Sequence, residues 1–512
     1  MTWGLNTYTH KACGLIFALL ICRLLILWLN PLGLHGDEAQ YWTWAQSLDW
    51  GYFSKPPLIA WIIAATTHIF GDYEWAIRLS SPIIHSLTAW IIFLTARDLW
   101  DTKVAFFATL LFLLMPALWI SSSIVSTDVA LLLCWALALN GWLRLRRAPN
   151  LFAAIQLGIA IGIGCLAKYA MIFFPIALII SLFFDPTSRQ IVRSRYIIWS
   201  GLISLLIISP NIYWNVNHDF ATVSHTASNT NWQNGISLNL GEFLSFMGDQ
   251  LAVFGPVPFV LFFIASLWVI RHTSHSHDKA RSDHGKTRSD DEDNPLVLLT
   301  IFALTPLIII SLQALLSRAN ANWAATSYVS ASLLTAYFFS HYQTRLKYWF
   351  WGGISAHTVI SFVLILGTLI PSLGEIIGLS NSTKRLKAWP QTVEAIHAVY
   401  ERGHDGQDFE LITIDRRIIF YSLKYYDIEK TAPIKMWMYQ SKPTNHAELT
   451  DPLAPTYGPV LLLQAHGDYT DEMRSDFDRL IPLPSIIIDL GGGKIREFSV
   501  WAGYGYTPTT ER

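Results

Sequence analysis

The residues best suited to chemistry stand together in one polar loop that follows the first apolar run. Asp37 and Glu38 are adjacent, and Lys55 precedes a rigid pair of prolines. A carboxylate within hydrogen-bond reach of a hydroxyl can take its proton as a general base, and a lysine can hold an anion as a point charge. If the segment that begins at Asp37 is helical, the two carboxylates point in different directions, so only one of them need face a reaction.

The same residues also have a purely structural interpretation. Asp37 would cap a short interfacial helix, Glu38 would lie in its first turn, and Lys55 would reach phospholipid head groups. However, the loop is longer than a simple connection needs, and its Trp and Tyr residues favour a position on a membrane, where an amphiphilic substrate would be found. We therefore interpret this loop as a candidate active site.

The elements that must position this loop are apolar helices. Hydrophobic residues make up 52% of the 512 residues and charged residues 14%, which is more apolar surface than one soluble core buries, so lipid is the expected solvent. The formal net charge of -1 gives no sign of nucleic-acid binding. The four cysteines lie within apolar runs and favour neither a disulfide framework nor a metal site. We expect no cofactor, and the sequence leaves a divalent metal open.

Apolar runs close to the ~20 residues that a membrane helix needs occur about 11 times along the chain. They lie near residues 12–29, 77–96, 104–122, 129–143, 151–166, 170–184, 196–214, 250–270, 296–316, 321–341 and 348–371. Lys and Arg gather in every second loop, so the positive-inside rule places the N-terminus in the cytoplasm. The segments that then share the outer face are the loop 30–76, the turns at Asp128 and at Lys168-Tyr169, the loop 215–249 and the turn from Arg318 to Asn322.

The composition changes after the last apolar run. Short strands are predicted at 409–415, 459–464 and 485–489, helices at 391–402 and 416–425, and a hairpin turn at the run Gly491-Gly492-Gly493. We therefore expect an α-helical polytopic membrane protein with a small C-terminal soluble α/β domain. Residues 1–375 would form a transmembrane catalytic domain with outer-face loops 30–76 and 215–249, and residues 376–512 a periplasmic α/β domain.

These motifs resemble those of bacterial GT-C glycosyltransferases, in the family that joins protein O-mannosyltransferases to the lipid A aminoarabinose transferases. The more specific matches are the D-E-x-x-Y motif at Asp37, Glu38 and Tyr41, and the Y-F-x-K-P-P-L motif from Tyr52 to Leu58. Weaker matches follow in family order over roughly residues 10–340: Arg78-Leu79, Ser126-Thr127-Asp128, Ala167-Lys168-Tyr169, Pro210 with Trp214-Asn215 and His218, and Ala321-Asn322-Trp323.

The resemblance implies a GT-C fold and an inverting transfer of a sugar from a polyprenyl-phosphate donor, on the periplasmic side of a bacterial inner membrane. The expected partners are this donor, a glycolipid acceptor such as lipid A, and membrane lipids, with no nucleic acid. Asp37 would be the general base, with Glu38 in reserve. The cations expected to bind the donor phosphate are Lys55, Arg78, Lys168 and Arg318, and the residues expected to contact substrate are Tyr41, Tyr52, Asp128, Tyr169, Asn215, His218, Asn322 and Trp323.

Other interpretations remain open at this stage. Arg78 and Arg318 also fit interfacial anchors, and Asp128 also fits a helix cap. A lipid-linked sugar flippase would pair charges near the membrane midplane and show inverted repeats, whereas the charges here gather at one face. A protein O-glycosyltransferase or a lipid-polymer ligase would share the carrier and differ in its acceptor. A structural scaffold would give no reason for two carboxylates and a lysine to share one loop.

Overall fold

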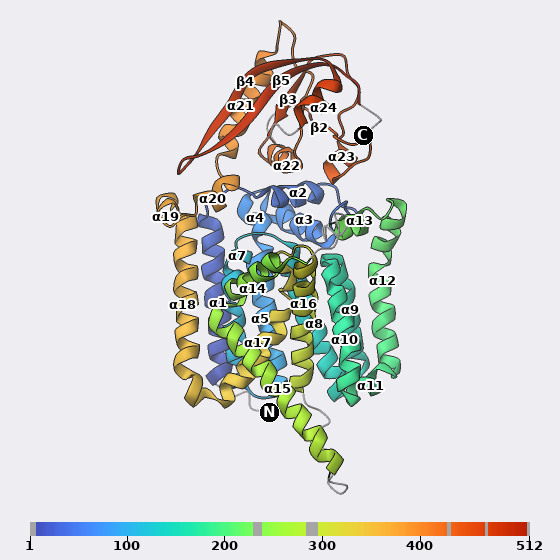
Figure 1. The fold of residues 1–512 in the computed structure, drawn as a ribbon, viewed down its shortest axis with the longest axis vertical. Coiled ribbons are helices and arrows are strands. Elements are labelled where there is room, and N and C mark those ends of the chain that lie inside the picture. Colours follow the sequence, from blue (N-terminus) through green and yellow to red (C-terminus); the bar gives the residue numbers. More distant parts are fainter. Residues whose placement is uncertain (1–6, 229–237, 283–294, 428–431, 466–468, 509–512) are drawn as a thin grey trace. The chain divides into compact units, whose positions relative to one another are not determined.

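The structure is a computed structural model, and it describes residues 7–228, 238–282, 295–427, 432–465 and 469–508. It is mostly helical, with a small sheet near the C-terminus, as the sequence predicts (Figure 1). Contacts divide the chain into two compact units. Unit 1 comprises Met1–Trp28, Lys55–Ile59 and Arg78–Val363, and unit 2 comprises Leu29–Ser54, Ala60–Ile77 and Leu364–Arg512. This division differs from the chain-order division expected above, because most of the first polar loop groups with the C-terminal residues.

Unit 1 is a bundle of helices (Figure 1). Its elements are α1 (Thr7–Leu29), α5 (Ser80–Leu99), α6 (Thr102–Leu113), α7 (Pro116–Ser121), α8 (Thr127–Arg147), α9 (Leu151–Ala167), η1 (Tyr169–Ile172), α10 (Phe173–Phe184), α11 (Pro186–Val192), α12 (Arg195–Asn217), α13 (Ala221–Ser228), α14 (Leu240–Phe254), α15 (Pro256–Ser282), α16 (Pro295–Leu316), η3 (Ala321–Ala324), α17 (Ser327–His341) and most of α18 (Gln343–Leu369). Helix α8 packs against α5 and α9, and α9 packs against α12.

Several helices are suited to crossing a membrane. Within the described ranges, six are long and apolar enough, and the count reaches seven if the bent pair α14 and α15 is one span. The six are Thr7–Leu29, Glu74–Leu99, Thr127–Arg147, Arg195–Asn217, Pro295–Leu316 and Thr344–Leu369, and shorter apolar helices include α6 and α9. These apolar helices indicate a membrane protein.

Two expected spans are broken in the structure, and one expected loop is partly helical. The run 250–270 contains a 105° bend between α14 and α15, where Gly255 adopts a φ of +96° and Pro256 follows. Glycine tolerates this left-handed backbone, and the proline begins the next helix. The run 104–122 is divided at Pro116 into α6 and α7, and the expected loop 215–249 contains α13 and much of α14.

Small residues bring α9 and α12 close together. A Cβ atom at Gly158 would lie 2.7 Å from the Ser200 carbonyl oxygen, and one at Gly162 would lie 2.8 Å from the Cβ of Ile207. Ser204 Oγ also donates a hydrogen bond to the Gly158 carbonyl oxygen at 2.9 Å. This spacing of two glycines four residues apart is typical of close helix contacts in membranes. It brings the middle of α9 against the N-terminal half and the middle of α12.

Unit 2 is built around a five-stranded sheet. Its helical elements are α2 (Gly36–Ala45), most of α3 (Leu58–Phe70), α4 (Glu74–Arg78), α19 (Pro371–Ile376), α20 (Ser380–Thr383), η4 (Lys384–Leu386), α21 (Trp389–Arg402), α22 (Arg417–Tyr426), α23 (His446–Thr450) and α24 (Thr470–Ser475). Its strands are β1 (Ile412–Ile414), β2 (Ile434–Met436), β3 (Val460–Gln464), β4 (Phe477–Gly491) and β5 (Lys494–Tyr506). Their order in the sheet is β2-β1-β3-β5-β4, and β4 and β5 form a long antiparallel hairpin (Figure 1).

The polar loop of residues 29–54 is fastened to α22. The Trp42 and Tyr425 rings meet edge to face with centroids 5.0 Å apart, and the Trp42 indole N–H donates to Asp72 at 2.7 Å. The backbone N–H of Leu34 donates to the Tyr426 hydroxyl at 2.8 Å. Aromatic contacts of this kind add to the free energy gained from burial. The loop is therefore an integral part of unit 2.

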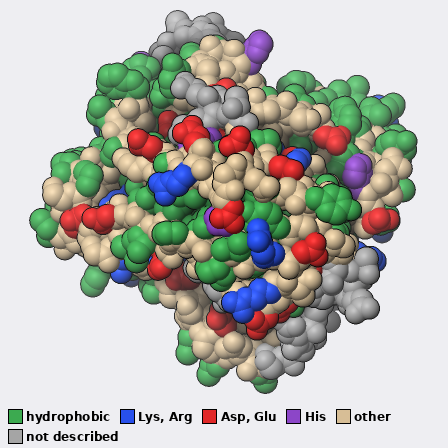
Figure 2. All heavy atoms as spheres, turned by 90° about the horizontal axis from the view of Figure 1, so that it is seen from above, with side chains coloured by type: hydrophobic (Ala, Val, Ile, Leu, Met, Phe, Trp, Pro, Cys, Tyr) green, Lys and Arg blue, Asp and Glu red, His purple; other side chains and the backbone are tan. Residues whose placement is uncertain are grey.

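In the view of Figure 2, acidic and basic side chains are interspersed on the visible surface.

Candidate functional site

In unit 1, three of the predicted site residues meet in one hydrogen-bonded group. Lys168 Nζ lies 2.7 Å from one carboxylate oxygen of Asp128, and Asn322 Nδ2 donates to the other at 2.6 Å. The Lys168 and Asp128 side chains are only 18% and 12% exposed. A carboxylate held on both oxygens is poorly placed to act as a base. The ammonium group carries three N–H donors, so one bond to Asp128 leaves capacity for an anion such as a phosphate.

Different elements place each member of this group. Asp128 lies in the first turn of α8, whose N-cap is Ser126, so the structure does not make Asp128 the cap. Lys168 is the C-cap of α9, whose position follows from the close glycine contacts with α12. Asn322 lies in η3, and the Ala321 carbonyl oxygen accepts a hydrogen bond from Gln250 at 3.1 Å.

Gln250 is a positioning residue that the sequence did not single out. Its side-chain oxygen accepts a 2.6 Å hydrogen bond from the buried Tyr328 hydroxyl, and its amide holds η3. The available signal was an amide at the start of the apolar run 250–270, because a buried polar side chain requires a partner.

A second polar group continues from Lys168 along the chain. The Tyr169 hydroxyl donates to Asn211 Oδ1 at 2.9 Å and accepts from Asn215 Nδ2 at 3.1 Å. Asn215 is buried, and among the described residues its Oδ1 has no hydrogen-bond partner, so this oxygen can accept one further hydrogen bond. The His218 ring stacks on Trp214 with centroids 4.0 Å apart, at the C-cap of α12.

In unit 2, Asp37 is half-exposed beside an arginine. Its side chain is 43% exposed, and Arg417 Nη1 lies 3.1 Å from one carboxylate oxygen. The same Nη1 donates to Gln40 Oε1 at 2.5 Å. Arg417 is the first residue of α22 and was not predicted as a site residue. The only signal was a pair of arginines after a short strand, which gave no hint of its partner. An accessible carboxylate held in place by one guanidinium can still take a proton from a hydroxyl.

Glu38 has the capping role that the structural interpretation gave to Asp37. The N-cap of α2 is His35, whose ring accepts from the Asp37 backbone N–H, while Glu38 Oε2 accepts from the His35 backbone N–H at 2.9 Å. This reciprocal arrangement is a capping box. Since Glu38 is 2% exposed, we regard Asp37 as the better candidate for the base.

The two predicted tyrosines of the loop lie in its packing. The buried Tyr52 ring stacks on Trp44 with centroids 4.5 Å apart, and its hydroxyl donates to the Trp44 carbonyl oxygen at 3.1 Å. Burial raises the pKa of Tyr52 to about 12, so its hydroxyl stays protonated at physiological pH. Tyr41 is also buried and lies 5.4 Å from the Trp44 ring. These positions favour a structural role over direct substrate contact.

The remaining predicted residues differ in burial. Lys55 and Arg78 belong to unit 1, where Lys55 is half-buried and Arg78 is 2% exposed. A guanidinium buried to this degree does not fit an interfacial anchor that reaches into water. Arg318 and Asn322 are exposed, and Trp323 is half-buried. That Asp37 and Lys55 act together at one active site stays a prediction. Within the described residues, no group of three His, Cys, Asp or Glu side chains is suited to a metal ion.

Comparisons with known proteins match this chain to the expected family. Residues 54–214 match the model described as dolichyl-phosphate-mannose-protein mannosyltransferase. The lipid A galacturonosyltransferase RgtD of Rhizobium johnstonii is 32% identical over 324 residues, covering 63% of this chain and 64% of that protein. The undecaprenyl phosphate-alpha-4-amino-4-deoxy-L-arabinose arabinosyl transferase of Pseudomonas savastanoi is 32% identical over 113 residues, covering 19% of this chain and 21% of that protein. The matched region thus spans slightly less than two thirds of the first of these relatives.

The fold extends the likeness over almost the whole chain. The crystal structure of ArnT from Cupriavidus metallidurans bound to undecaprenyl phosphate has a TM-score of 0.63 and 14% identity, covering 97% of this chain and 99% of that one. Its apo form gives a TM-score of 0.62. Sequence and fold together confirm the predicted resemblance to the GT-C glycosyltransferases of the protein mannosyltransferase and lipid A aminoarabinose transferase family.

Proposed function

We propose that this protein is an inverting glycosyltransferase that moves a sugar from a polyprenyl-phosphate donor to lipid A or another envelope glycolipid. The reaction would take place at the periplasmic face of the bacterial inner membrane, with about 11 segments crossing the bilayer. The names of the two relatives support a lipid-linked donor and a lipid A acceptor. The structural observation that carries the proposal is the meeting of Asp128, Lys168 and Asn322, which come from distant parts of the sequence.

The proposed roles follow from the chemistry of the donor. A sugar phosphodiester departs as a stabilised phosphate anion, which needs compensating positive charge more than a proton. Lys168 is the best-defined cation for this role, because Asp128 orients it and leaves donors on its ammonium group. Lys55, Arg78 and Arg318 are further proposed phosphate-binding residues. Asp37 is the proposed general base, which takes the proton of the acceptor hydroxyl as the new glycosidic bond forms.

The direct test is mass spectrometry of envelope glycolipids from cells with and without the gene. We expect lipid A or the lipopolysaccharide core to lose one sugar in the deletion strain and to regain it with the wild-type gene. Complementation with the Asp37→Asn variant should fail. An unchanged glycolipid profile in the deletion strain would contradict the proposal.

A lipid-linked sugar flippase is the main alternative, and purified protein separates the two. Protein in lipid nanodiscs, supplied with undecaprenyl-phosphate-linked sugar and lipid A, should form glycosylated lipid A. A nanodisc has no closed compartment, so a flippase would leave no product in this assay. If glycosylated lipid A does not form while proteoliposomes redistribute the donor between leaflets, the flippase interpretation would replace ours.

A further inference from the structure

A pocket with basic residues at its rim opens in unit 1, at the far end of α8 from Asp128. Its volume is about 280 Å³, and its lining includes Asp98, Asn140, Arg144 and Arg147. Asp128 lies in the first turn of α8, whereas the two arginines lie in the last turn of this 21-residue helix. At 1.5 Å per residue the helix is roughly 30 Å long. The pocket is therefore distinct from the group around Asp128.

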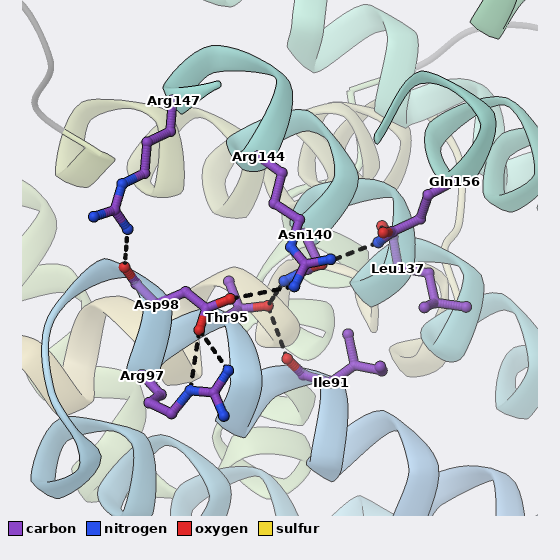
Figure 3. A network of polar contacts seen from close by, with 9 residues as sticks. All are labelled: Ile91, Thr95, Arg97, Asp98, Leu137, Asn140, Arg144, Arg147 and Gln156. Carbon is purple, nitrogen blue, oxygen red and sulfur yellow. Dashed lines mark hydrogen bonds and ion pairs between the residues drawn. The ribbon is translucent and has the colours of Figure 1, made fainter. Parts of the chain in front are cut away.

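Three guanidinium groups gather around Asp98 beside this pocket, two on its carboxylate and one on its backbone carbonyl oxygen (Figure 3). Arg97 donates to Asp98 Oδ1 at 3.0 and 2.7 Å, and Arg144 Nη2 lies 3.4 Å from Asp98 Oδ2. Arg147 Nη1 donates to the Asp98 carbonyl oxygen at 2.6 Å. Three positive groups beside one negative group leave a net charge of two positive. This excess favours an anion at the rim.

The neighbouring Arg146, in the same helix turn, has its positive charge neutralised by a carboxylate. Its guanidinium binds both oxygens of Asp185 at 3.0 and 2.9 Å, and the two side chains are 3% and 6% exposed. That ion pair is buried and is not accessible to an outside anion. By contrast, the Arg144 side chain is 41% exposed and Arg147 is exposed. The two arginines of the pocket are thus accessible from outside the bundle.

The lining of the pocket also combines polar and apolar side chains. Asn140 donates to Thr95 Oγ1 at 2.9 Å and accepts from Gln156 at 3.0 Å, which gives a polar floor within the bundle (Figure 3). Phe152 lines the pocket and is 69% exposed, and the neighbouring Leu151 is 51% exposed. Exposed apolar side chains on a membrane helix face acyl chains.

We propose that this pocket binds the head-group phosphate of an anionic phospholipid, held at the membrane face opposite the end of α8 that carries Asp128. Arginine forks match phosphate oxygens bidentately, and basic pockets between membrane helices hold anionic head groups. Phe152 and Leu151 lie where the first carbons of the acyl chains would pass. A soluble phosphate would use the arginines but would gain nothing from these apolar side chains.

The test is native mass spectrometry of the purified full-length protein titrated with phosphatidylglycerol or with phosphatidylcholine. We expect phosphatidylglycerol to bind more tightly. The Arg147→Ala variant should weaken its binding about five-fold, and adding Arg144→Ala should weaken it further by a similar factor, as each basic residue near a membrane surface contributes about that much. Arg147→Lys should keep part of the affinity, because it retains the positive charge but loses the bidentate fork.

The matched control is Arg193→Ala, which removes an exposed arginine just beyond α11, outside the pocket. It should leave binding unchanged. Equal affinity for the two lipids, or an equal loss in the control, would overturn the proposal. Displacement of the lipid by inorganic phosphate at comparable concentration would overturn it in favour of a soluble anion. Because Arg147 is exposed, its single variant should fold normally, and an unchanged melting temperature checks this.

Discussion

The polar residues of unit 1 and unit 2 are held in different ways. Asp128 in unit 1 is 12% exposed, and each of its oxygens is bound by a side chain from another element. Asp37 in unit 2 is 43% exposed and has one guanidinium 3.1 Å away. The first arrangement fixes a charged group in place, and the second leaves a carboxylate able to exchange partners. We therefore expect substitutions of Asp128 or Lys168 to change stability and donor binding together, and substitutions at Asp37 to change mainly the rate.

The largest expected effect comes from Asp37→Asn. Loss of a general base should lower the transfer rate by about 10²- to 10⁴-fold, because the amide cannot take the acceptor's proton. The melting temperature should change little, since the side chain is half-exposed. Single-turnover transfer by purified protein measures the rate. Asp49→Asn, which changes an exposed acid of the same loop, is the matched control and should transfer normally. A wild-type rate in Asp37→Asn would remove Asp37 from the mechanism.

The next effect comes from Lys168→Ala. The variant leaves Asp128 mostly buried without its cation, which should cost about 3 kcal/mol of unfolding free energy and weaken donor binding. Thermal unfolding and donor titration measure the two effects. The double variant Asp128→Asn with Lys168→Met separates them, because removing both charges should recover stability while donor binding stays weak. If donor binding recovers as well, Lys168 has only a structural role.

A smaller effect is expected from Arg417→Ala. This positioning residue should lower kcat about ten-fold with KM unchanged, the equivalent of about 1.4 kcal/mol for one charged hydrogen bond. The unfolding free energy should change by less than about 1 kcal/mol, because the pair is partly exposed. Arg417→Lys should restore part of kcat. Arg474→Ala removes an exposed arginine elsewhere in unit 2 and should leave kcat unchanged. An equal loss in this control would argue against positioning.

The smallest effect concerns how α22, which carries Arg417, is fastened to the sheet. Burial pushes the pKa of Asp451 upward, but the ammonium groups of Lys424 in α22 and Lys435 in β2 hold it below its usual value. A lowered folded-state pKa adds stability above the ordinary pKa of an aspartate, and this stability is lost as the pH falls through the folded-state value. Asp451→Asn should therefore lose up to about 1 kcal/mol at pH 7 and little below pH ~3. An equal loss of unfolding free energy at the two pH values would contradict the role given to the Asp451 carboxylate.

Local patterns in the sequence predicted most of the secondary structure. The three glycines at 491–493 have φ values of +76°, +59° and +70° and form the predicted hairpin turn. The segment 459–464 forms β3 almost unchanged. Strand β4 runs from Phe477 to Gly491, well beyond the predicted strand 485–489, and it contains Pro482 and Pro484. Both prolines are tolerated because β4 lies at the edge of the sheet. On its outer side no neighbouring strand requires the backbone N–H that a proline lacks.

The sequence by itself determined the membrane character, the small C-terminal sheet and the family motifs, because these depend on composition and on the spacing of neighbouring residues. Only the tertiary structure decided that Asp128 is bound by Lys168 and Asn322, and that Asp37 is bound by Arg417. The partner residues in the last pair are 380 positions apart. A contact between such distant residues depends on how helices and strands pack, which no local periodicity records.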